Sequence, residues 1–230
     1  MPDTALPLSP AGNFARAEAA AAAAGLIVLG ALHPARHGLS YPDRGTLLLL
    51  GSGPAFWPAL TAAPEYRGGA PDPVDRWSRR IGQALAAELG ATAHFPFGGP
   101  PFAPFVAWAL ASGRAFVSPV RMLVHDAAGM MLSYRAALHF EAEFDIPPPP
   151  LADSPCQSCA ARPCLSACPA GALAADEPYD LAACHAHLSR AAGRECMDGG
   201  CLARRACPLS RASGRDPAQS AHHMRYFHPR

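Results

Sequence analysis

The cysteines of this chain are confined to its last third, and this distribution constrains the fold more than any other feature. All eight lie between Cys156 and Cys207, and residues 1–155 contain none. They open with a Cys-x2-Cys pair, and two of them, Cys168 and Cys207, directly precede a proline. Because thiolates gathered in one short segment are typical metal ligands, the segment predicts a metal-binding domain.

The cysteine-rich region holds too few large apolar residues to fold around a hydrophobic core of its own. It follows the polyproline segment Pro147–Pro150, which neither a helix interior nor a central strand can contain. A small region of this kind needs metal coordination for its stability. We therefore expect an N-terminal domain over 1–146, a proline linker over 147–150, a metal-binding domain over 151–212 and a C-terminal tail over 213–230.

The spacing of the cysteines favours iron–sulfur clusters. The first block reads Cys-x2-Cys-x4-Cys-x3-Cys-Pro, with small residues between most of the thiols. In two-cluster ferredoxins the fourth cysteine of such a block, which precedes a proline, binds the other cluster. The x4 gap departs from the usual x2 and lengthens the loop. Crossed binding predicts two [4Fe–4S] clusters, one held by Cys156, Cys159, Cys164 and Cys207 and the other by Cys168, Cys184, Cys196 and Cys201.

Three other uses of the thiols stay open on the sequence alone. Two four-cysteine zinc sites would use the same thiolates, although structural zinc sites usually present two close pairs and this chain has one Cys-x2-Cys. A disulfide framework requires an exported chain. A redox-active Cys-x2-Cys pair would leave the other cysteines unexplained.

Charge and hydropathy disfavour two classes of partner. The net charge is +1, and the 19 basic residues, all arginine, are balanced by 18 acids, so the chain lacks the basic footprint of a nucleic-acid-binding protein. The uncharged run Ala19–Leu32 is too short for a membrane span, and no basic segment precedes it. A helix that turns at Gly25 into a strand explains this run better. We expect a cytoplasmic protein, in which thiols stay reduced.

The N-terminal domain alternates helical and strand-like segments. Thr46–Leu50 is apolar from Leu47 onward, as expected of a strand covered on both faces. Asp72 and Pro73 are typical of a helix start, and apolar residues then recur at three- and four-residue steps. That apolar face consists of Val74, Trp77, Ile81, Leu85 and Leu89. Further expected elements are a helix over 11–24, strands over 26–32 and 91–95, a helix over 103–112 and a helix beginning at Ala218.

A β-hairpin is predicted over residues 121–140. The segment Asp126-Ala-Ala-Gly129 has the residues of a turn and separates the arms 121–125 and 130–140. Alternation places Leu132, Tyr134, Ala136, Leu138 and Phe140 on one face of the second arm. The opposite face carries Ser133, Arg135, Ala137 and His139, a row that faces solvent or lines a pocket.

The cysteine motifs occur in a specific order. They are Cys156-Gln-Ser-Cys159, Pro163-Cys164, Cys168-Pro169-Ala-Gly-Ala-Leu173, Cys184, Gly200-Cys201 and Cys207-Pro208. In the number and order of ligands they resemble the bis-[4Fe–4S] module of epoxyqueuosine reductases and reductive dehalogenases. The resemblance implies clusters that pass single electrons to a corrinoid held by an N-terminal domain.

The N-terminal domain carries a second resemblance. Its segments are Leu39-Ser-Tyr-Pro42 with Thr46–Leu50 and Pro54–Trp57, then Asp72–Asp75, then Val124-His125 through Gly129 to Tyr134-Arg135-Ala136. Together they are similar to the cobalamin-processing family, which removes the upper ligands of cobalamin and has a fold akin to flavin nitroreductases. The chain lacks the Gly-Leu-Gly-x-x-Gly-Lys segment and the helical repeats of epoxyqueuosine reductases, which disfavours a tRNA substrate.

These resemblances imply an α+β protein in which a nitroreductase-like α/β domain precedes a small ferredoxin-like bis-[4Fe–4S] domain. The expected function is that of an iron–sulfur oxidoreductase that relays electrons to a corrinoid, or alternatively to a flavin, in the N-terminal domain. A redox partner protein would supply the electrons. The expected cofactor-binding residues are His94, His125, Arg135 and His139. The alternative is a ferredoxin-like electron carrier without an organic cofactor, whose N-terminal domain docks a partner.

Overall fold

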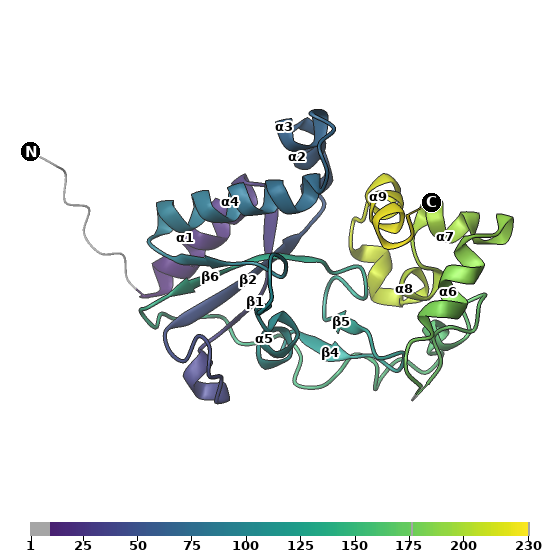
Figure 1. The fold of residues 1–230 in the computed structure, drawn as a ribbon. Helices are drawn as coiled ribbons and strands as arrows, with labels where there is room; N and C mark the ends of the chain where they lie inside the picture. The colour runs from purple at the N-terminus through teal and green to yellow at the C-terminus, as the bar shows by residue number, and fades with distance from the viewer. Residues whose placement is uncertain (1–9, 176, 230) are drawn as a thin grey trace, which may run out of the picture. The chain divides into compact units, whose positions relative to one another are not determined.

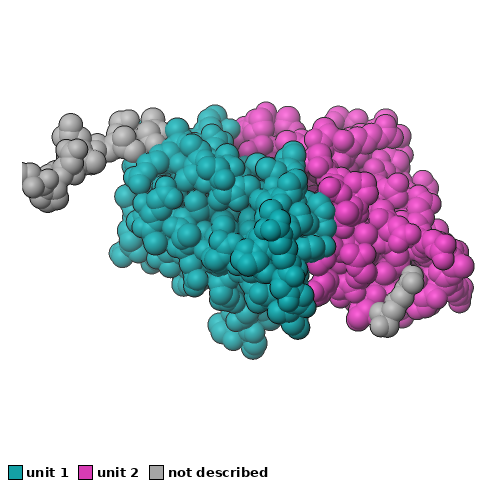
Figure 2. Space-filling model, turned by 90° about the horizontal axis from the view of Figure 1, so that it is seen from above, with its two compact units in different colours: residues 1–112, 134–148 teal, residues 113–133, 149–230 magenta. Residues whose placement is uncertain are grey.

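The chain folds into a mixed α+β structure with two compact units. The computed structural model describes residues 10–175 and 177–229. Unit 1 comprises Met1–Ser112 and Tyr134–Pro148, and unit 2 comprises Gly113–Ser133 and Pro149–Arg230, as coloured in Figure 2. The change of unit between Pro148 and Pro149 falls within the expected proline linker. The segment Gly113–Ser133, which the sequence places in the N-terminal domain, belongs instead to the same compact unit as the cysteines.

Unit 1 is built on one antiparallel sheet with the strand order β1-β2-β6-β3. Its strands are β1 (Leu26–Leu32), β2 (Thr46–Ser52), β3 (Thr92–His94) and β6 (Tyr134–Phe140). All seven residues of β2 are buried, which confirms the prediction of a strand covered on both faces.

Helices cover both faces of this sheet (Figure 1). Helices α1 (Pro10–Ala23) and α4 (Pro73–Leu89) pack on one face, where Trp77 and Leu85 of α4 join Leu48 and Leu138 in a core cluster. Helix α5 (Phe105–Ala111) lies on the other face. The remaining elements are η1 (Pro34–His37), α2 (Phe56–Ala62) and α3 (Pro64–Arg67).

The two clearest helix predictions are confirmed. Helix α4 begins at Pro73, and Val74, Trp77 and Leu85 of its predicted apolar face are buried. Asp72 precedes the helix, but its side chain makes no capping hydrogen bond. Helix α1 and strand β1 are joined at Gly25, whose φ of +84° suits glycine. No helix in the described part of the chain is both long and apolar enough to cross a membrane.

The predicted hairpin over 121–140 is wrong. Its first arm, β5 (Leu123–His125), pairs with β4 (Ala115–Val117), and its second arm, β6, lies between β2 and β3 of the other sheet. The turn itself exists, because the backbones of His125 and Gly129 exchange two hydrogen bonds of 2.9 and 3.0 Å. After this turn the chain continues into the four-stranded sheet. There all seven residues of β2 are buried, and its four leucines pair with residues 136–139 of β6.

A β-bulge at Arg135 overturns the predicted alternation along β6. Leu50 pairs with Ala136 and Gly51 pairs with Tyr134, so Arg135 is one extra residue in β6. The ring of Tyr134 consequently lies against Phe105 of α5, with ring centroids 6.2 Å apart. Ala136 lies near Gly82 of α4, on the opposite face. Because one residue is inserted, the side chains before the bulge point to the opposite face of the sheet from the one that regular alternation predicts.

Unit 2 has short elements and small apolar clusters. Besides the β4–β5 ribbon it contains η2 (Pro163–Leu165), α6 (Leu181–Leu188), η3 (Ala191–Gly193), α7 (Arg194–Gly199), α8 (Leu202–Ala206), η4 (Pro208–Ala212) and α9 (Pro217–Phe227). Its buried clusters include Cys164, Cys196 and Cys207 themselves. The thiols thus occupy the interior that larger apolar side chains fill elsewhere.

Candidate metal centre

The structure brings the eight cysteines together in the two groups of four that the spacing predicts. The first group, called site I below, lines a cavity of about 310 Å³ in unit 2. Prolines, Val124 and Met130 form much of the remaining wall. Site I consists of Cys156, Cys159, Cys164 and Cys207.

Local turns aim the thiols of site I at the cavity. Cys156 lies in the turn closed by a hydrogen bond of 3.0 Å from Gln157 N to Ser154 O, and Cys159 follows it. Cys164 lies on η2, where it is buried. Cys207 directly precedes η4 and comes from the far end of the sequence motif.

The second group, called site II, lines a separate cavity of about 170 Å³. Cys168 begins a turn in which Gly171 N donates to its carbonyl oxygen at 3.1 Å. Three other segments, α6, α7 and the start of α8, supply the remaining thiols. Site II consists of Cys168, Cys184, Cys196 and Cys201.

Helix α8 connects the two sites directly. Cys201 flanks its first residue and Cys207 flanks its last, so each end of one short helix contributes a thiol to a different site. Six residues of helix correspond to roughly 9 Å at 1.5 Å per residue. The two sites are therefore close neighbours within unit 2.

Burial makes thiolates costly at both sites without a compensating cation. In site I the pKa of Cys156 and of Cys164 is raised by burial, and nearby cysteines of the same site raise it further. In site II burial also raises the pKa of Cys184 and of Cys196, and Cys201 and Cys168 add to the effect. Bound metal would supply the positive charge that offsets this repulsion.

Each group of four thiols lines one cavity. All eight cysteines are free, and no group of three or more His, Cys, Asp or Glu side chains within residues 10–175 and 177–229 is close enough to hold a single metal ion. In a [4Fe–4S] cluster each of four thiolates binds a different iron, so the donors are spread around the cluster. Four thiols lining one cavity fit such a group.

Two residues that sequence reasoning missed lie beside site II. The hydroxyl of Tyr179 donates a hydrogen bond of 3.1 Å to Cys184 Sγ. Arg204 lines the site II cavity, and burial lowers its pKa while Cys201 opposes that effect. The sequence position of Arg204 could have indicated its role, because it lies between Cys201 and Cys207, on the helix that joins the two sites.

Of the four predicted cofactor-binding residues, His94 and His139 lie together in unit 1. They occupy neighbouring strands, and their ring centroids are 6.0 Å apart. His94 Nδ1 lies 3.3 Å from the Tyr41 hydroxyl, and its ring meets Trp108 edge-on. Burial, followed by the nearby charge of His139, lowers the pKa of His94.

Arg135 does not join these histidines, because the bulge directs it towards α4. Its guanidinium lies 3.7 Å from the carboxylate of Asp75. Burial raises the pKa of Asp75, and Arg135 opposes this rise. Arg135 thus serves a helix–sheet ion pair in unit 1.

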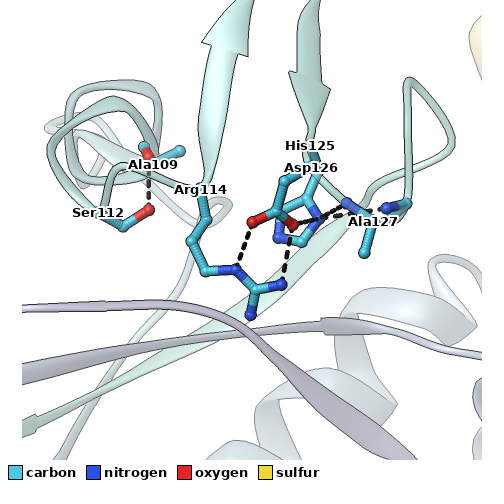
Figure 3. Close-up of polar contacts among 7 residues, drawn as sticks. Ala109, Ser112, Arg114, His125, Asp126 and Ala127 are labelled. Carbon is cyan, nitrogen blue, oxygen red and sulfur yellow. Dashed lines mark hydrogen bonds and ion pairs between the residues drawn. The ribbon is translucent and has the colours of Figure 1, made fainter. Parts of the chain in front are cut away.

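His125 belongs to unit 2, where it stabilises the turn that follows β5 (Figure 3). Its Nδ1 accepts hydrogen bonds from the backbone N–H groups of Ala127 at 3.1 Å and Ala128 at 3.2 Å. Asp126 Oδ1 lies 3.0 Å from the same nitrogen, but a nitrogen that accepts two N–H bonds carries no proton to donate. Arg114 holds Asp126 with two bonds of 2.8 Å. His125 is therefore part of a structural network.

Comparison with known proteins identifies no relative of this chain. No protein-family model, curated protein or solved structure matches it.

Proposed function

We propose that unit 2 holds two [4Fe–4S] clusters, one at site I and one at site II, and transfers single electrons between them and a redox partner protein. The observation that carries the proposal is the division of eight thiols into two groups of four around two cavities. The order of the cysteines along the chain supports it. Cys168 lines site II although the three cysteines before it line site I, and Cys207 lines site I although the three before it line site II.

The residues of this chain would perform three tasks in electron transfer. The eight thiolates bind iron, and the short loops fix their positions. Prolines and apolar side chains such as Val124 and Met130 limit the access of water to site I. Helix α8 keeps the two sites close, which suits the passage of electrons from one to the other. The clusters supply one-electron exchange when they are bound.

The corrinoid or flavin expected in the N-terminal domain remains a prediction, and the proposed electron transfer does not involve it. His94 and His139 are adjacent in unit 1, whereas Arg135 is paired with Asp75 and His125 is held in a turn of unit 2. The four residues therefore do not form one cofactor site within a unit. An electron carrier requires none of them.

Anaerobic purification and reconstitution with iron and sulfide test the proposal. Two clusters predict about eight irons and eight sulfides per chain, with the broad visible absorption of [4Fe–4S] centres that bleaches on reduction. About two zinc ions per chain and no sulfide would overturn it. Titrating cobalamin and then a flavin into the loaded protein separates a carrier from a cofactor-dependent reductase, because binding to unit 1 changes the spectrum of either cofactor.

A further inference from the structure

The hydrogen bond from Tyr179 to Cys184 is fixed by the start of helix α6. Asp180 caps this helix by accepting from Ala183 N at 2.8 Å, and Cys184 N donates to Asp180 O at 3.1 Å. Tyr179 therefore directly precedes the capping residue, while Cys184 lies on the first turn of the helix. This arrangement places the hydroxyl 3.1 Å from the Cys184 sulfur.

Further contacts hold the ring of Tyr179 in place. It is half-buried and lies parallel to the ring of Phe227, with an interplanar angle of 7° and centroids 6.5 Å apart. The backbone beside it is anchored by a bond of 3.0 Å from Asp180 N to Ala172 O. A phenol carries one O–H donor, and this contact aims it at the sulfur.

We propose that Tyr179 raises the reduction potential of the cluster at site II through its hydrogen bond to Cys184, an inference that rests on the proposed function. Reduction adds one electron from a redox partner to the cluster, whose negative charge is shared with the thiolate sulfurs. A hydrogen bond to such a sulfur is stronger in the more negative state, so it favours reduction. No atom or proton leaves Tyr179 in this step.

The surroundings of site I provide an internal comparison. There Ser154 Oγ accepts a hydrogen bond of 3.3 Å from the backbone N–H of Cys156. The Ser154 hydroxyl therefore contacts the backbone of its cysteine, whereas the Tyr179 hydroxyl donates to a cysteine sulfur at site II. Removing the Tyr179 hydroxyl is therefore expected to shift the potential of the site II cluster and to leave that of the site I cluster unchanged.

The test is a redox titration of the loaded protein, followed by electron paramagnetic resonance, in the wild type and in Tyr179→Phe. Loss of the hydroxyl is expected to reduce the equilibrium constant for adding one electron to one cluster by about fivefold to tenfold, or about 40 to 60 mV at 59 mV per tenfold. The potential of the other cluster is expected to stay unchanged. Tyr226→Phe removes a hydroxyl from an exposed tyrosine in α9 and is expected to change neither.

A second substitution changes the strength of the donor and not its size. Replacing Tyr179 by 3,5-difluorotyrosine makes the phenol a stronger donor, so the potential that falls in Tyr179→Phe is expected to rise. Iron and sulfide counts of the wild type decide the proposed function separately. If the wild type holds two clusters and the fluorinated protein shows no shift or a downward shift, the role of Tyr179 is refuted, whether or not Tyr179→Phe folds.

Discussion

Arg204 donates from Nε to the carbonyl oxygen of Met130 at 2.7 Å. The same guanidinium donates to Leu132 O at 3.3 Å. These bonds join helix α8, which connects the two cysteine sites, to a segment that precedes it by more than 70 residues. The segment after β5 is thereby incorporated into unit 2, and this explains why the compact unit extends beyond the region that contains the cysteines.

Arg204→Met is expected to destabilise the loaded protein by about 2 kcal/mol, because two partly buried carbonyls lose charged donors. Arg204→Lys keeps the charge but lacks the planar fork, so it is expected to recover less than half of this loss. The free energy of unfolding in urea measures the effect. Arg205→Met is the matched control, since Arg205 is exposed and forms an ion pair of 3.3 Å with Glu195, which is also exposed. Its expected cost is below about 1 kcal/mol, and equal losses in Arg204→Met and Arg205→Met would contradict the prediction.

Gly129 is predicted to be the most sensitive glycine of unit 2. Its φ is +57°, and a Cβ at this position would lie 2.4 Å from Ser210 N, which is backbone and cannot move aside cheaply. Gly171 has nearly the same φ, +61°, but no atom lies within 4 Å of its Cβ position. Gly171→Ala is therefore expected to cost about 1 kcal/mol from the backbone alone, and Gly129→Ala at least about 2 kcal/mol more.

Urea unfolding of the two alanine variants measures this difference directly. Because both positions need the left-handed conformation, the comparison isolates the contact with Ser210. Similar stabilities of the two variants would show that the Gly129 turn does not pack against η4.

The grouping of the thiols was largely predictable from the sequence, whereas the strand pairing was not. The predicted grouping follows from the order of the cysteines in the motif. In the structure Cys156 and Cys207 line one cavity and Cys168 lines the other, while ligation itself stays a prediction. The hairpin prediction failed because neighbouring strands compete for partners. Strand β2 is apolar enough to recruit β6, and no local signal in residues 121–140 reveals that competitor.

Two features of single residues also could not be predicted from the sequence. The apolar and polar residues around Arg135 alternate as they would in a regular strand. The bulge, and the change of face that it causes, is therefore visible only in the pairing of β6 with β2. Tyr179 is separated from Cys184 by an ordinary helix start, and the sequence does not show which way its ring points. Its ring lies parallel to that of Phe227, a residue 48 positions further along the chain.

Double substitutions test the grouping of the cysteines more sharply than single ones. Cys156→Ala with Cys207→Ala is expected to remove one cluster, because both thiols line site I although they lie at opposite ends of the motif. Cys164→Ala with Cys168→Ala is expected to remove both clusters, although these residues are close in sequence. Iron analysis should give about half of the wild-type content in the first case and almost none in the second. The reverse result would contradict crossed ligation.

His94 is expected to make the stability of unit 1 depend on pH. Its pKa is lowered in the folded chain, so the fold favours the neutral ring, and Tyr41 lies 3.3 Å from Nδ1. This contribution to stability is fully present above the unfolded pKa of about 6.5 and is lost as the pH falls through the lower folded value. The difference in unfolding free energy between the wild type and His94→Gln should therefore shrink from pH 7.5 to pH 5.

His139→Gln should raise the midpoint of the His94 ring in an NMR titration, because it removes a neighbouring positive charge. A His94 midpoint at or above 6.5 in the wild type would contradict the prediction.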